Sequence, residues 1–356
     1  MDIAVAVDRP PIEEASAARR RIADRVFWGS FFFHAALTVY WVVLYLTGWT
    51  SPFFREHSIS LASLGRIAAA VGLFYIVWGF IWWGVKTALL KYMVGFTKEE
   101  RRRAFSSRMD AAGYNVADLV ARYSERRIRI ADMIGRRGRF MVMMLPGLFF
   151  LYLQVRNTPT ANFATIFLQE NLFEALATNW IFLGFYYANG ILAASFYGAQ
   201  SRVMDGVLAR ANCLLITTLW TAFKFVMLPI GAALATMFPP NRFAVLFVLI
   251  WCSYAAADAF SEIGGSLFGK QKLKVWGLGD VNRKSVGGTV SGFVASLAVC
   301  LLVVLSAGLP APWIVLAVVI ACSNSLLELY SPRGTDDFVM ATTNALICLA
   351  FGALIT

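Results

Sequence analysis

The sequence has few charged residues and very few histidines, and these shortages narrow the classes of protein that it can encode. Only 15% of its 356 residues carry a charge, against about a quarter in a soluble domain. His34 and His57 are its only histidines, so we expect neither a histidine-based zinc site nor a Ser-His-Asp triad. The composition excludes an ordinary soluble enzyme, a nucleic-acid-binding module and a disordered protein.

Closely spaced cysteines are lacking as well. The five cysteines stand far apart, each inside an apolar run, so we expect packing residues rather than a metal or redox motif. The first 25 residues carry five arginines, and the hydrophobic run that follows is longer than that of a cleavable signal peptide. We therefore expect no cleaved leader.

Long hydrophobic runs, by contrast, are abundant. Hydrophobic residues make up 59% of the chain, and the mean hydropathy is +0.64. A helix that crosses a membrane needs about 20 mostly apolar residues. The candidate segments are 26–46, 64–85, 140–155, 179–199, 213–237, 243–261, 290–308, 313–330 and 338–355. The sequence therefore predicts an all-α fold, a polytopic transmembrane helical bundle with about nine spanning helices.

The basic residues are distributed unequally between the two sides of these spans. With the N-terminus in the cytoplasm, 27 of the 32 lysines and arginines fall in cytoplasmic segments. This asymmetry is typical of membrane proteins, so topology explains the net charge of +11 without a nucleic-acid partner. A bacterial inner membrane and a eukaryotic endomembrane both fit this topology.

The chain divides into three parts on this interpretation. Residues 1–25 form a cytoplasmic tail, 26–249 an N-terminal transmembrane region, and 250–356 a catalytic transmembrane region. Within the second part, residues 97–139 hold twelve basic and six acidic residues interrupted by apolar ones. This basic segment fits amphipathic helices bound to anionic lipid head groups on the inner leaflet, or a solvated helical hairpin.

Ionisable residues gather where the later spans reach the cytoplasmic side. Asp258, Glu262, Gly265 and Gly269 follow one another at helical spacing, so they share one face of a helix. Two carboxylates suit a hard cation such as Mg²⁺, and a strip of glycines lets phosphates approach the backbone. Glycines at this spacing also serve as helix-packing residues.

The next loop carries positive charge and ends in a glycine pair. Lys270, Arg283 and Lys284 are candidates for neutralising phosphates. Gly287 and Gly288 open the following helix, whose N-terminal N–H groups can bind an anion.

A second acidic set lies on the same predicted side of the membrane. Glu328 stands at the end of the eighth span, and Asp336 and Asp337 stand just before the ninth. Acidic groups at the mouths of spans are costly, so they are candidates for function.

Together these residues resemble the membrane lipid-kinase branch that includes phytol kinase, dolichol kinase and the CTP-dependent diacylglycerol kinases. They are more distantly similar to CDP-diacylglycerol synthase. The shared pattern lies within about 250–356 and comprises Asp258, Glu262, Gly265, Gly269, Arg283-Lys284-Ser285-x-Gly287-Gly288, Glu328 and Asp336-Asp337. Ala257 and Phe338 depart from it, at positions where the family often has Gly and usually has Asn.

The resemblance implies transfer of a phosphoryl group from CTP, or another nucleoside triphosphate, to a membrane lipid alcohol such as phytol or a polyprenol. It implies Mg²⁺ as cofactor, with the metal ligands Asp258, Glu262, Asp336 and Asp337. The catalytic residues would be Asp258, Glu262, Glu328 and Lys284. The nucleotide-binding residues would be Gly265, Gly269, Lys270, Arg283, Ser285, Gly287 and Gly288.

Other functions remain open at this point. A phosphatidate cytidylyltransferase would use a similar site but attack the α-phosphate of CTP. A lipid or solute transporter would use intramembrane polar residues such as Lys224 and Asn189. A non-catalytic member is a third alternative, motivated by Phe338. A homo-oligomer is compatible with the sequence.

Overall fold

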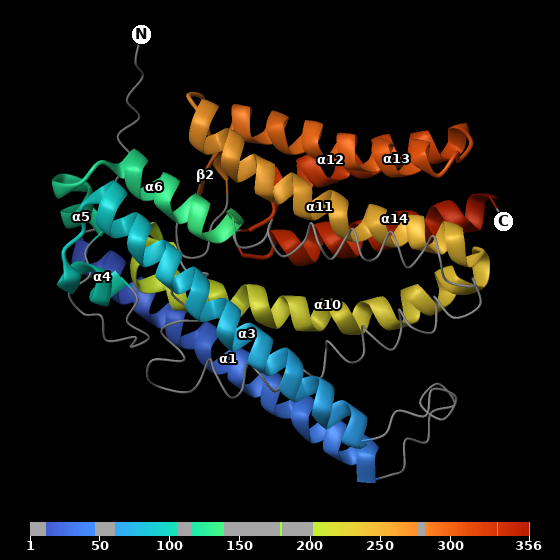
Figure 1. The fold of residues 1–356 in the computed structure, drawn as a ribbon, viewed down its shortest axis with the longest axis horizontal. Coiled ribbons are helices and arrows are strands. Elements are labelled where there is room, and N and C mark those ends of the chain that lie inside the picture. Colours follow the sequence, from blue (N-terminus) through green and yellow to red (C-terminus); the bar gives the residue numbers. More distant parts are fainter. Residues whose placement is uncertain are drawn as a thin grey trace.

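The computed structural model describes residues 12–46, 61–104, 116–138, 179, 202–275, 282–332 and 334–355. Nearly all of them are helical, as the sequence predicts (Figure 1). Among the described residues, five helices are long and apolar enough to cross a membrane. These helices are α10 (Ala209–Met237), α11 (Pro240–Phe268), α12 (Val286–Ser306), α13 (Ala311–Tyr330) and α14 (Asp336–Ile355).

Two further long helices come from the N-terminal part of the chain. The predicted spans 26–46 and 64–85 fall within α1 (Ile12–Leu46) and α3 (Leu61–Leu89). The predicted span 140–155, and 179–199 apart from Asn179, lie outside the described residues. The count of nine spans and the orientation of the N-terminus therefore stay predictions.

The described part of the basic segment folds into short helices. They are α4 (Lys98–Ala104), α5 (Val116–Arg122), α6 (Glu125–Met133) and the π-helical turn η2 (Ile134–Gly138). A π-helical turn η1 (Leu90–Val94) joins them to α3, and a 3₁₀ turn η4 (Val203–Leu208) leads into α10. In Figure 1 these short helices gather at the end of the molecule that also holds β2.

A small β-hairpin departs from the all-α prediction. Strands β1 (Lys272–Val275) and β2 (Asn282–Ser285) pair antiparallel, with Leu273 opposite Lys284. The charged and apolar residues of β1 alternate, which suits a half-buried strand better than a helix. The hairpin matters for function because β2 carries Lys284 toward the ends of the neighbouring helices.

Sequence signals set the boundaries of the C-terminal helices. Prolines stand at the first turns of α11 and α13, where a missing N–H costs nothing. Helix α12 begins after Ser285, whose hydroxyl accepts a hydrogen bond of 3.1 Å from the N–H of Gly288. These starts place the acidic residues at the ends of α11 and α13 and at the start of α14.

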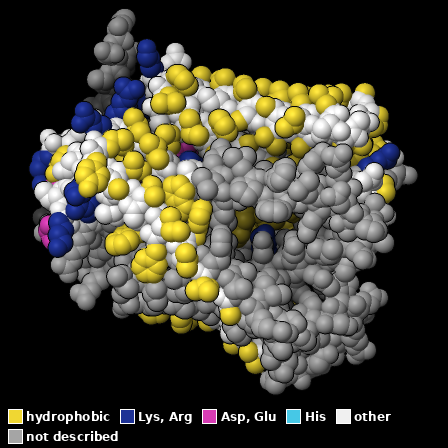
Figure 2. Space-filling model, viewed as in Figure 1, with side chains coloured by type: hydrophobic (Ala, Val, Ile, Leu, Met, Phe, Trp, Pro, Cys, Tyr) yellow, Lys and Arg dark blue, Asp and Glu magenta, His cyan; other side chains and the backbone are white. Residues whose placement is uncertain are grey.

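The main apolar core lies among α10–α14, which we call the C-terminal bundle. Its large buried side chains include Phe223, Phe243, Trp251 and Trp313. The outer faces of α12 and α13 expose valines and leucines, and Figure 2 shows hydrophobic side chains along this edge. Such a surface suits contact with lipid chains rather than water.

A polar network crosses the centre of this core. The fully buried amide of Asn324 donates to Ser253 Oγ at 3.0 Å and to Ser296 Oγ at 3.1 Å. The buried Asn344 donates to the same Ser253 Oγ at 3.2 Å. The network therefore links α11, α12, α13 and α14 within the apolar interior.

Candidate functional site

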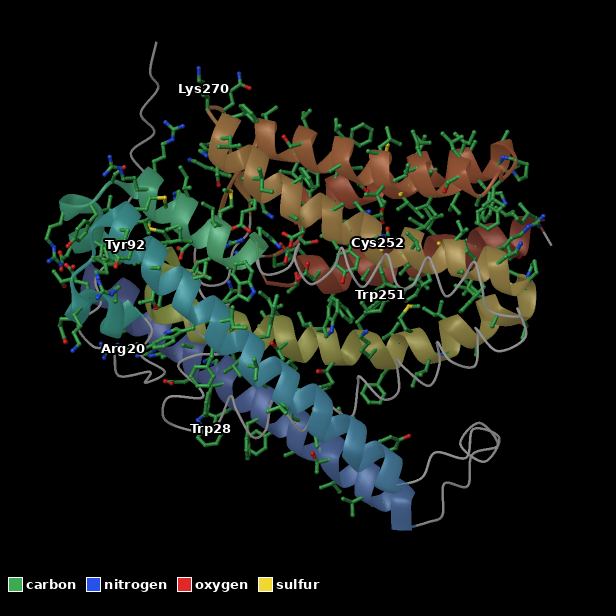
Figure 3. All side chains as sticks on the ribbon, in the orientation of Figure 1. Arg20, Trp28, Tyr92, Trp251, Cys252 and Lys270 are labelled. Atoms are coloured by element: carbon green, nitrogen blue, oxygen red, sulfur yellow. The ribbon has the colours of Figure 1, made fainter. Side chains whose placement is uncertain are left out.

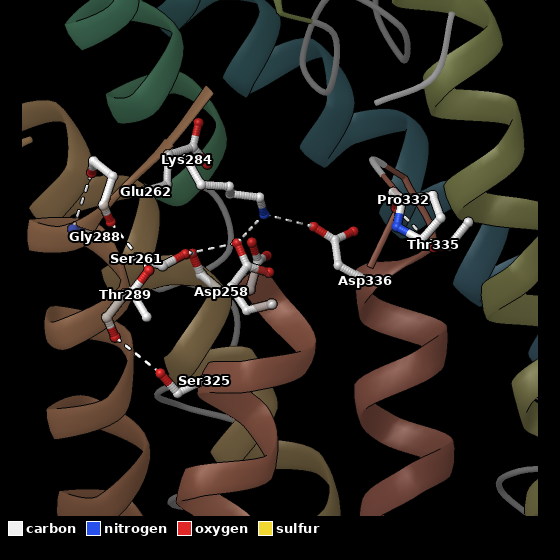
Figure 4. Close-up of polar contacts among 12 residues, drawn as sticks. Asp258, Ser261, Glu262, Lys284, Gly288, Thr289, Ser325, Pro332, Thr335 and Asp336 are labelled. Carbon is white, nitrogen blue, oxygen red and sulfur yellow. Dashed lines mark hydrogen bonds and ion pairs between the residues drawn. The ribbon is translucent and has the colours of Figure 1, made fainter. Parts of the chain in front are cut away.

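Three carboxylates from three helices meet at one end of the C-terminal bundle. Asp258 in α11, Glu328 near the end of α13 and Asp336 at the start of α14 each place an oxygen within 4.8 Å of the other two. We call these residues the carboxylate cluster. Figure 4 shows Asp258 and Asp336 on either side of the Lys284 side chain. Three oxygens this close form a potential site for a hard cation.

Lys284 of strand β2 reaches into the carboxylate cluster. Its Nζ lies 2.5 Å from Glu328 Oε1 and 3.7 Å from Asp336 Oδ2 (Figure 4). Burial disfavours the charged form of Lys284, but Glu328 and Asp336 outweigh it and raise the pKa of this lysine above its usual range. Lys284 therefore remains a cation at neutral pH.

Only one of the two carboxylate oxygens of Glu328 receives hydrogen bonds from described residues. Ser261 Oγ donates to Glu328 Oε1 at 3.0 Å, the same oxygen that contacts Lys284. Oxygen Oε2 is buried and receives no hydrogen bond from any described residue. A buried carboxylate oxygen without a donor costs free energy, so this place suits either a proton shared with the neighbouring Asp336 or a further ligand.

Three arginines surround the other acidic residue of α11. Arg136 Nη1 lies 3.1 Å from Glu262 Oε1, Arg137 Nε lies 2.5 Å from Oε2, and Arg202 Nη2 lies 3.3 Å from Oε1. We call these residues the arginine cradle. Arg136 and Arg137 come from η2, whereas Arg202 immediately precedes η4. The segments are far apart in the sequence, yet their guanidinium groups converge on one carboxylate.

Arg137 connects the arginine cradle to the carboxylate cluster. Its Nη1 and Nη2 atoms each lie 2.5 Å from one oxygen of Asp258, in the bidentate arrangement that favours arginine over lysine. Burial disfavours its charge, but Asp258 and Glu262 outweigh that penalty and raise the pKa of Arg137 well above its usual range. Arg137 therefore keeps its positive charge in a largely buried position.

A buried ion pair holds the two arginine-bearing segments in place. Lys86 of α3 lies 3.1 Å from Asp132 of α6, and both side chains are almost fully buried. Asp132 Oδ2 also accepts a 2.8 Å hydrogen bond from the backbone N–H of Val203. Asp132 stands one turn before Arg136, and Val203 follows Arg202 directly. Asp132 therefore holds in place both of the segments whose arginines contact Glu262.

The glycines of the sequence pattern pack α11 against α12. A Cβ on Gly288 would lie 2.6 Å from the carbonyl oxygen of Ser261, and one on Gly264 would lie 2.1 Å from Ser291 Oγ. A Cβ on Gly265 or Gly269 would crowd Ser285 Oγ at 3.1 or 2.7 Å. The strip that the sequence presents as open to phosphates is thus covered by the start of α12, which is the helix-packing alternative.

Other predicted site residues have more varied positions. Lys270 is exposed in the turn after α11, at the edge of the molecule in Figure 3, and Gly287 packs against Phe268. The side chain of Arg283 lies outside the described residues. Asp337 is half-buried in the first turn of α14, beside Asp336, and is not one of the three described residues whose oxygens lie within 4.8 Å of one another.

Most of the acidic residues lie together as the spacing predicts, because Asp258 and Glu262 share one face of α11 and Glu328 and Asp336 join them. The sequence interpretation missed Arg136, Arg137 and Arg202. It assigned the first two to the basic segment, as part of a lipid-binding surface or of a solvated helical hairpin. Their location on the same predicted side of the membrane as the acidic residues was the available signal.

Lys224, which motivates the transporter alternative, lies in α10 within the apolar core. Its Nζ is 3.9 Å from the ring centroid of Trp251 and 5.2 Å from that of Trp220. Trp251 is labelled in the middle of the bundle in Figure 3. A buried ammonium group over an indole face is stabilised by cation–π attraction, so this arrangement accounts for the lysine without a transported substrate.

Comparisons with known protein families, curated proteins and solved structures find no match to this chain. The site itself, with an arginine cradle beside a carboxylate cluster at the end of a membrane-type helix bundle, is therefore the basis for assigning a function.

Proposed function

We propose that this protein is an integral membrane lipid kinase that transfers the γ-phosphoryl group of CTP, or of another nucleoside triphosphate, to a lipid alcohol. The observation that carries the proposal is the carboxylate cluster, in which Glu328 Oε2 is buried without a hydrogen-bond donor among the described residues. Phosphoryl transfer requires a hard cation and charged groups to position the phosphates. The described residues offer carboxylates that could hold the cation, and charged side chains that could position the phosphates, within one small region.

Mg²⁺ fits the residues present. Proteins bind Mg²⁺ through one or two carboxylates together with substrate phosphates, and Asp258 and Asp336 are the carboxylates that we assign to this role. When bound, the ion would neutralise charge on the phosphate oxygens during transfer. Glu262, whose carboxylate contacts three arginines, is no longer among the proposed metal ligands.

The side chains of the cluster can account for the remaining steps. The hydroxyl oxygen of the alcohol forms a bond to the γ-phosphorus, the bond from that phosphorus to the β–γ bridging oxygen breaks, and the nucleoside diphosphate leaves. We assign the hydroxyl proton to Glu328 Oε2, because this acceptor is buried and Oε1 is already held by Lys284 and Ser261. Lys284 offsets part of the negative charge of the cluster.

The proposal includes a membrane arrangement. It retains nine spans and a cytoplasmic N-terminus, which puts the site at the cytoplasmic face. The lipid alcohol would reach the site from the bilayer along the apolar helix surfaces. Anionic lipid head groups would contact the basic segment, where Arg126, Arg127 and Arg129 of α6 are exposed.

A dual-label assay tests the function. Purified protein in detergent–lipid micelles with Mg²⁺ receives CTP labelled at the α- or the γ-phosphate, together with isoprenoid alcohols, diacylglycerol and phosphatidate. We expect the lipid phase to take label from γ-CTP only. Label from α-CTP only would identify a cytidylyltransferase, and label from neither, with γ-ATP also silent, would contradict both enzyme assignments.

Asp258→Asn provides the matched inactive variant. We expect its rate to fall by about 100-fold or more, since groups that stabilise charge in the transition state contribute that much. Glu125→Gln is the control, because Glu125 pairs with Arg129 on the exposed surface of α6. Near-normal turnover by Asp258→Asn, with an unchanged melting temperature, would remove Asp258 from the site.

A further inference from the structure

The arginine cradle holds more positive charge than the acidic residues it touches. Three guanidinium groups face the two carboxylates of Asp258 and Glu262. A single buried carboxylate needs one well-placed partner to be stable, and each extra buried charge adds a desolvation cost. The third arginine is therefore more than the two contacted carboxylates need, and Asp205, Asp336 and Asp337 balance part of the cradle's charge from farther away. The case for an anionic ligand accordingly depends on the hydrogen-bond donors.

Hydrogen-bond donors are also in excess. The two oxygens of Glu262 already receive Arg136, Arg137 and Arg202. Yet Nε of Arg202 is buried without an acceptor among the described residues. A phosphate group offers more acceptor oxygens than a carboxylate and binds guanidinium groups in the same planar, two-point manner. The donors that Glu262 leaves unused match the additional oxygens of a phosphate.

The cradle also lies beside the site proposed for the cation. Asp258 contacts Arg137 with both oxygens and belongs to the carboxylate cluster as well. On the other side of Asp258, Lys284 is the cation in contact with Glu328 and Asp336. Positive charge thus dominates on one side of Asp258 and negative charge on the other, which complements a phosphate bound next to a metal ion.

We propose that Arg136, Arg137 and Arg202 bind a phosphate group of the substrate, and that Glu262 occupies this position when the substrate is absent. The inference rests on the proposed function only in taking the anion to be a substrate phosphate. That phosphate belongs to the nucleotide or, for the phosphatidate substrate of the cytidylyltransferase alternative, to a lipid head group. The two share the same recognition chemistry. Glu262 is then an internal competitor for the arginines and not a metal ligand.

Binding measured without metal isolates the cradle from the carboxylate cluster. The full chain in detergent, with EDTA present, is titrated with CTP and with inorganic pyrophosphate by calorimetry. We expect Arg202→Ala to weaken binding by about tenfold or more, the contribution of a charge-assisted hydrogen bond, and Arg202→Lys to weaken it less. Arg242→Ala, which removes an exposed arginine in the first turn of α11, far along that helix from Asp258, is the matched control and should bind as the wild type does.

Glu262→Gln gives an effect of opposite sign. Removing the competing negative charge should tighten binding of CTP or pyrophosphate, whereas loss of a metal ligand would leave metal-free binding unchanged. Equal affinities of wild type, Arg202→Ala and Glu262→Gln for CTP, for pyrophosphate and for phosphatidate would overturn the proposal, and so would absence of binding to all three probes. Should Glu262→Gln fail to fold, the two substitutions of Arg202 still test the proposal, because Arg202→Ala is expected to weaken binding more than Arg202→Lys.

A second experiment, in lipid nanodiscs, distinguishes a nucleotide phosphate from a lipid phosphate as the ligand. The same variants are placed in nanodiscs of neutral lipid with or without phosphatidate, and binding is followed by the change in melting temperature. A response to phosphatidate alone assigns the cradle to a lipid head group, and a response to CTP alone assigns it to the nucleotide. Either response supports the cradle even if the labelling assay finds no kinase activity. Undiminished kinase activity, CTP affinity and phosphatidate response in Arg202→Ala would refute the cradle while leaving the proposed function intact.

Discussion

The N-terminal half and the C-terminal bundle are stabilised in different ways. In the C-terminal bundle, large apolar side chains fill the core, and glycines let α11 and α12 approach within backbone contact. In the N-terminal half, the described core around α6 is small, with Leu90, Phe96 and Ile128 among its members, and the Lys86–Asp132 pair is buried beside it. Among the described residues, close apolar packing therefore stabilises the C-terminal bundle, whereas a buried ion pair contributes much of the stability of the N-terminal half.

This difference bears on how the site is built. The carboxylates come from the half whose helix positions are fixed by packing, whereas the arginines come from the half whose segments are fixed by an ion pair. Substitutions that affect packing and those that affect charge should therefore have separable effects on the two sides of the site.

The largest effect is expected from Lys86→Met. Removing one partner of a buried ion pair leaves an uncompensated charge and costs about 3–5 kcal/mol, so the free energy of unfolding should fall by that amount. The measurement is reversible denaturation in mixed micelles. The double variant Lys86→Met/Asp132→Asn should recover most of the loss, because it removes the uncompensated charge and keeps an oxygen that accepts from the N–H of Val203. A small effect of the single variant would show that the N-terminal half is also stabilised mainly by packing.

A smaller loss is expected from Gly288→Ala in the C-terminal bundle. The new Cβ would lie 2.6 Å from the carbonyl oxygen of Ser261, so α11 and α12 must separate. Overpacking of this kind typically costs about 1–3 kcal/mol. Gly84→Ala in α3 is the control, because its Cβ would meet no described atom within 4 Å beyond the adjacent residues and backbone of its own helix, and alanine favours helix by about 1 kcal/mol. Equal melting temperatures for the two variants would contradict the backbone contact.

The smallest expected effect is the change with pH of the stabilisation that the charge of Lys284 provides. Its pKa is raised above the ordinary 10.5 because Glu328 and Asp336 outweigh the effect of burial. The stabilisation from its charge is therefore fully present below 10.5 and is lost as pH rises through the higher folded-state pKa. The melting temperature of wild type should exceed that of Lys284→Met by a constant margin from pH 7 to about 10, and the margin should narrow above that range. A margin that narrows already between pH 7 and 9 would show that Lys284 does not stay charged.

The sequence was sufficient to predict the helices of the C-terminal bundle and the shared face of Asp258 and Glu262. Hydrophobic run length and helical spacing are local properties, so one chain reveals them. The association of Glu328 and Asp336 with Asp258 was also anticipated, because topology put all three on one side of the membrane. The structure brings their oxygens within 4.8 Å of one another.

The arginine cradle could not be predicted from the same information. The basic segment holds twelve lysines and arginines, and sequence spacing does not distinguish Arg137, which is buried, from Arg129, which is exposed. That distinction depends on how α6 packs on α3 and on the hydrogen bond from Val203 to Asp132. The roles of the glycines were ambiguous for a similar reason, because packing and phosphate binding require the same lack of a side chain.

The buried amides of Asn324 and Asn344 have a consequence for the site above them. Apolar helices can slide past one another by a turn at little cost, and a single buried asparagine is enough to select one register. Asn324 stands four residues before Glu328, and Ser253, to which it donates, stands five residues before Asp258. The hydrogen bond between them therefore sets the relative heights of α11 and α13. The two carboxylates consequently end at the same level, which a purely apolar interior would not specify.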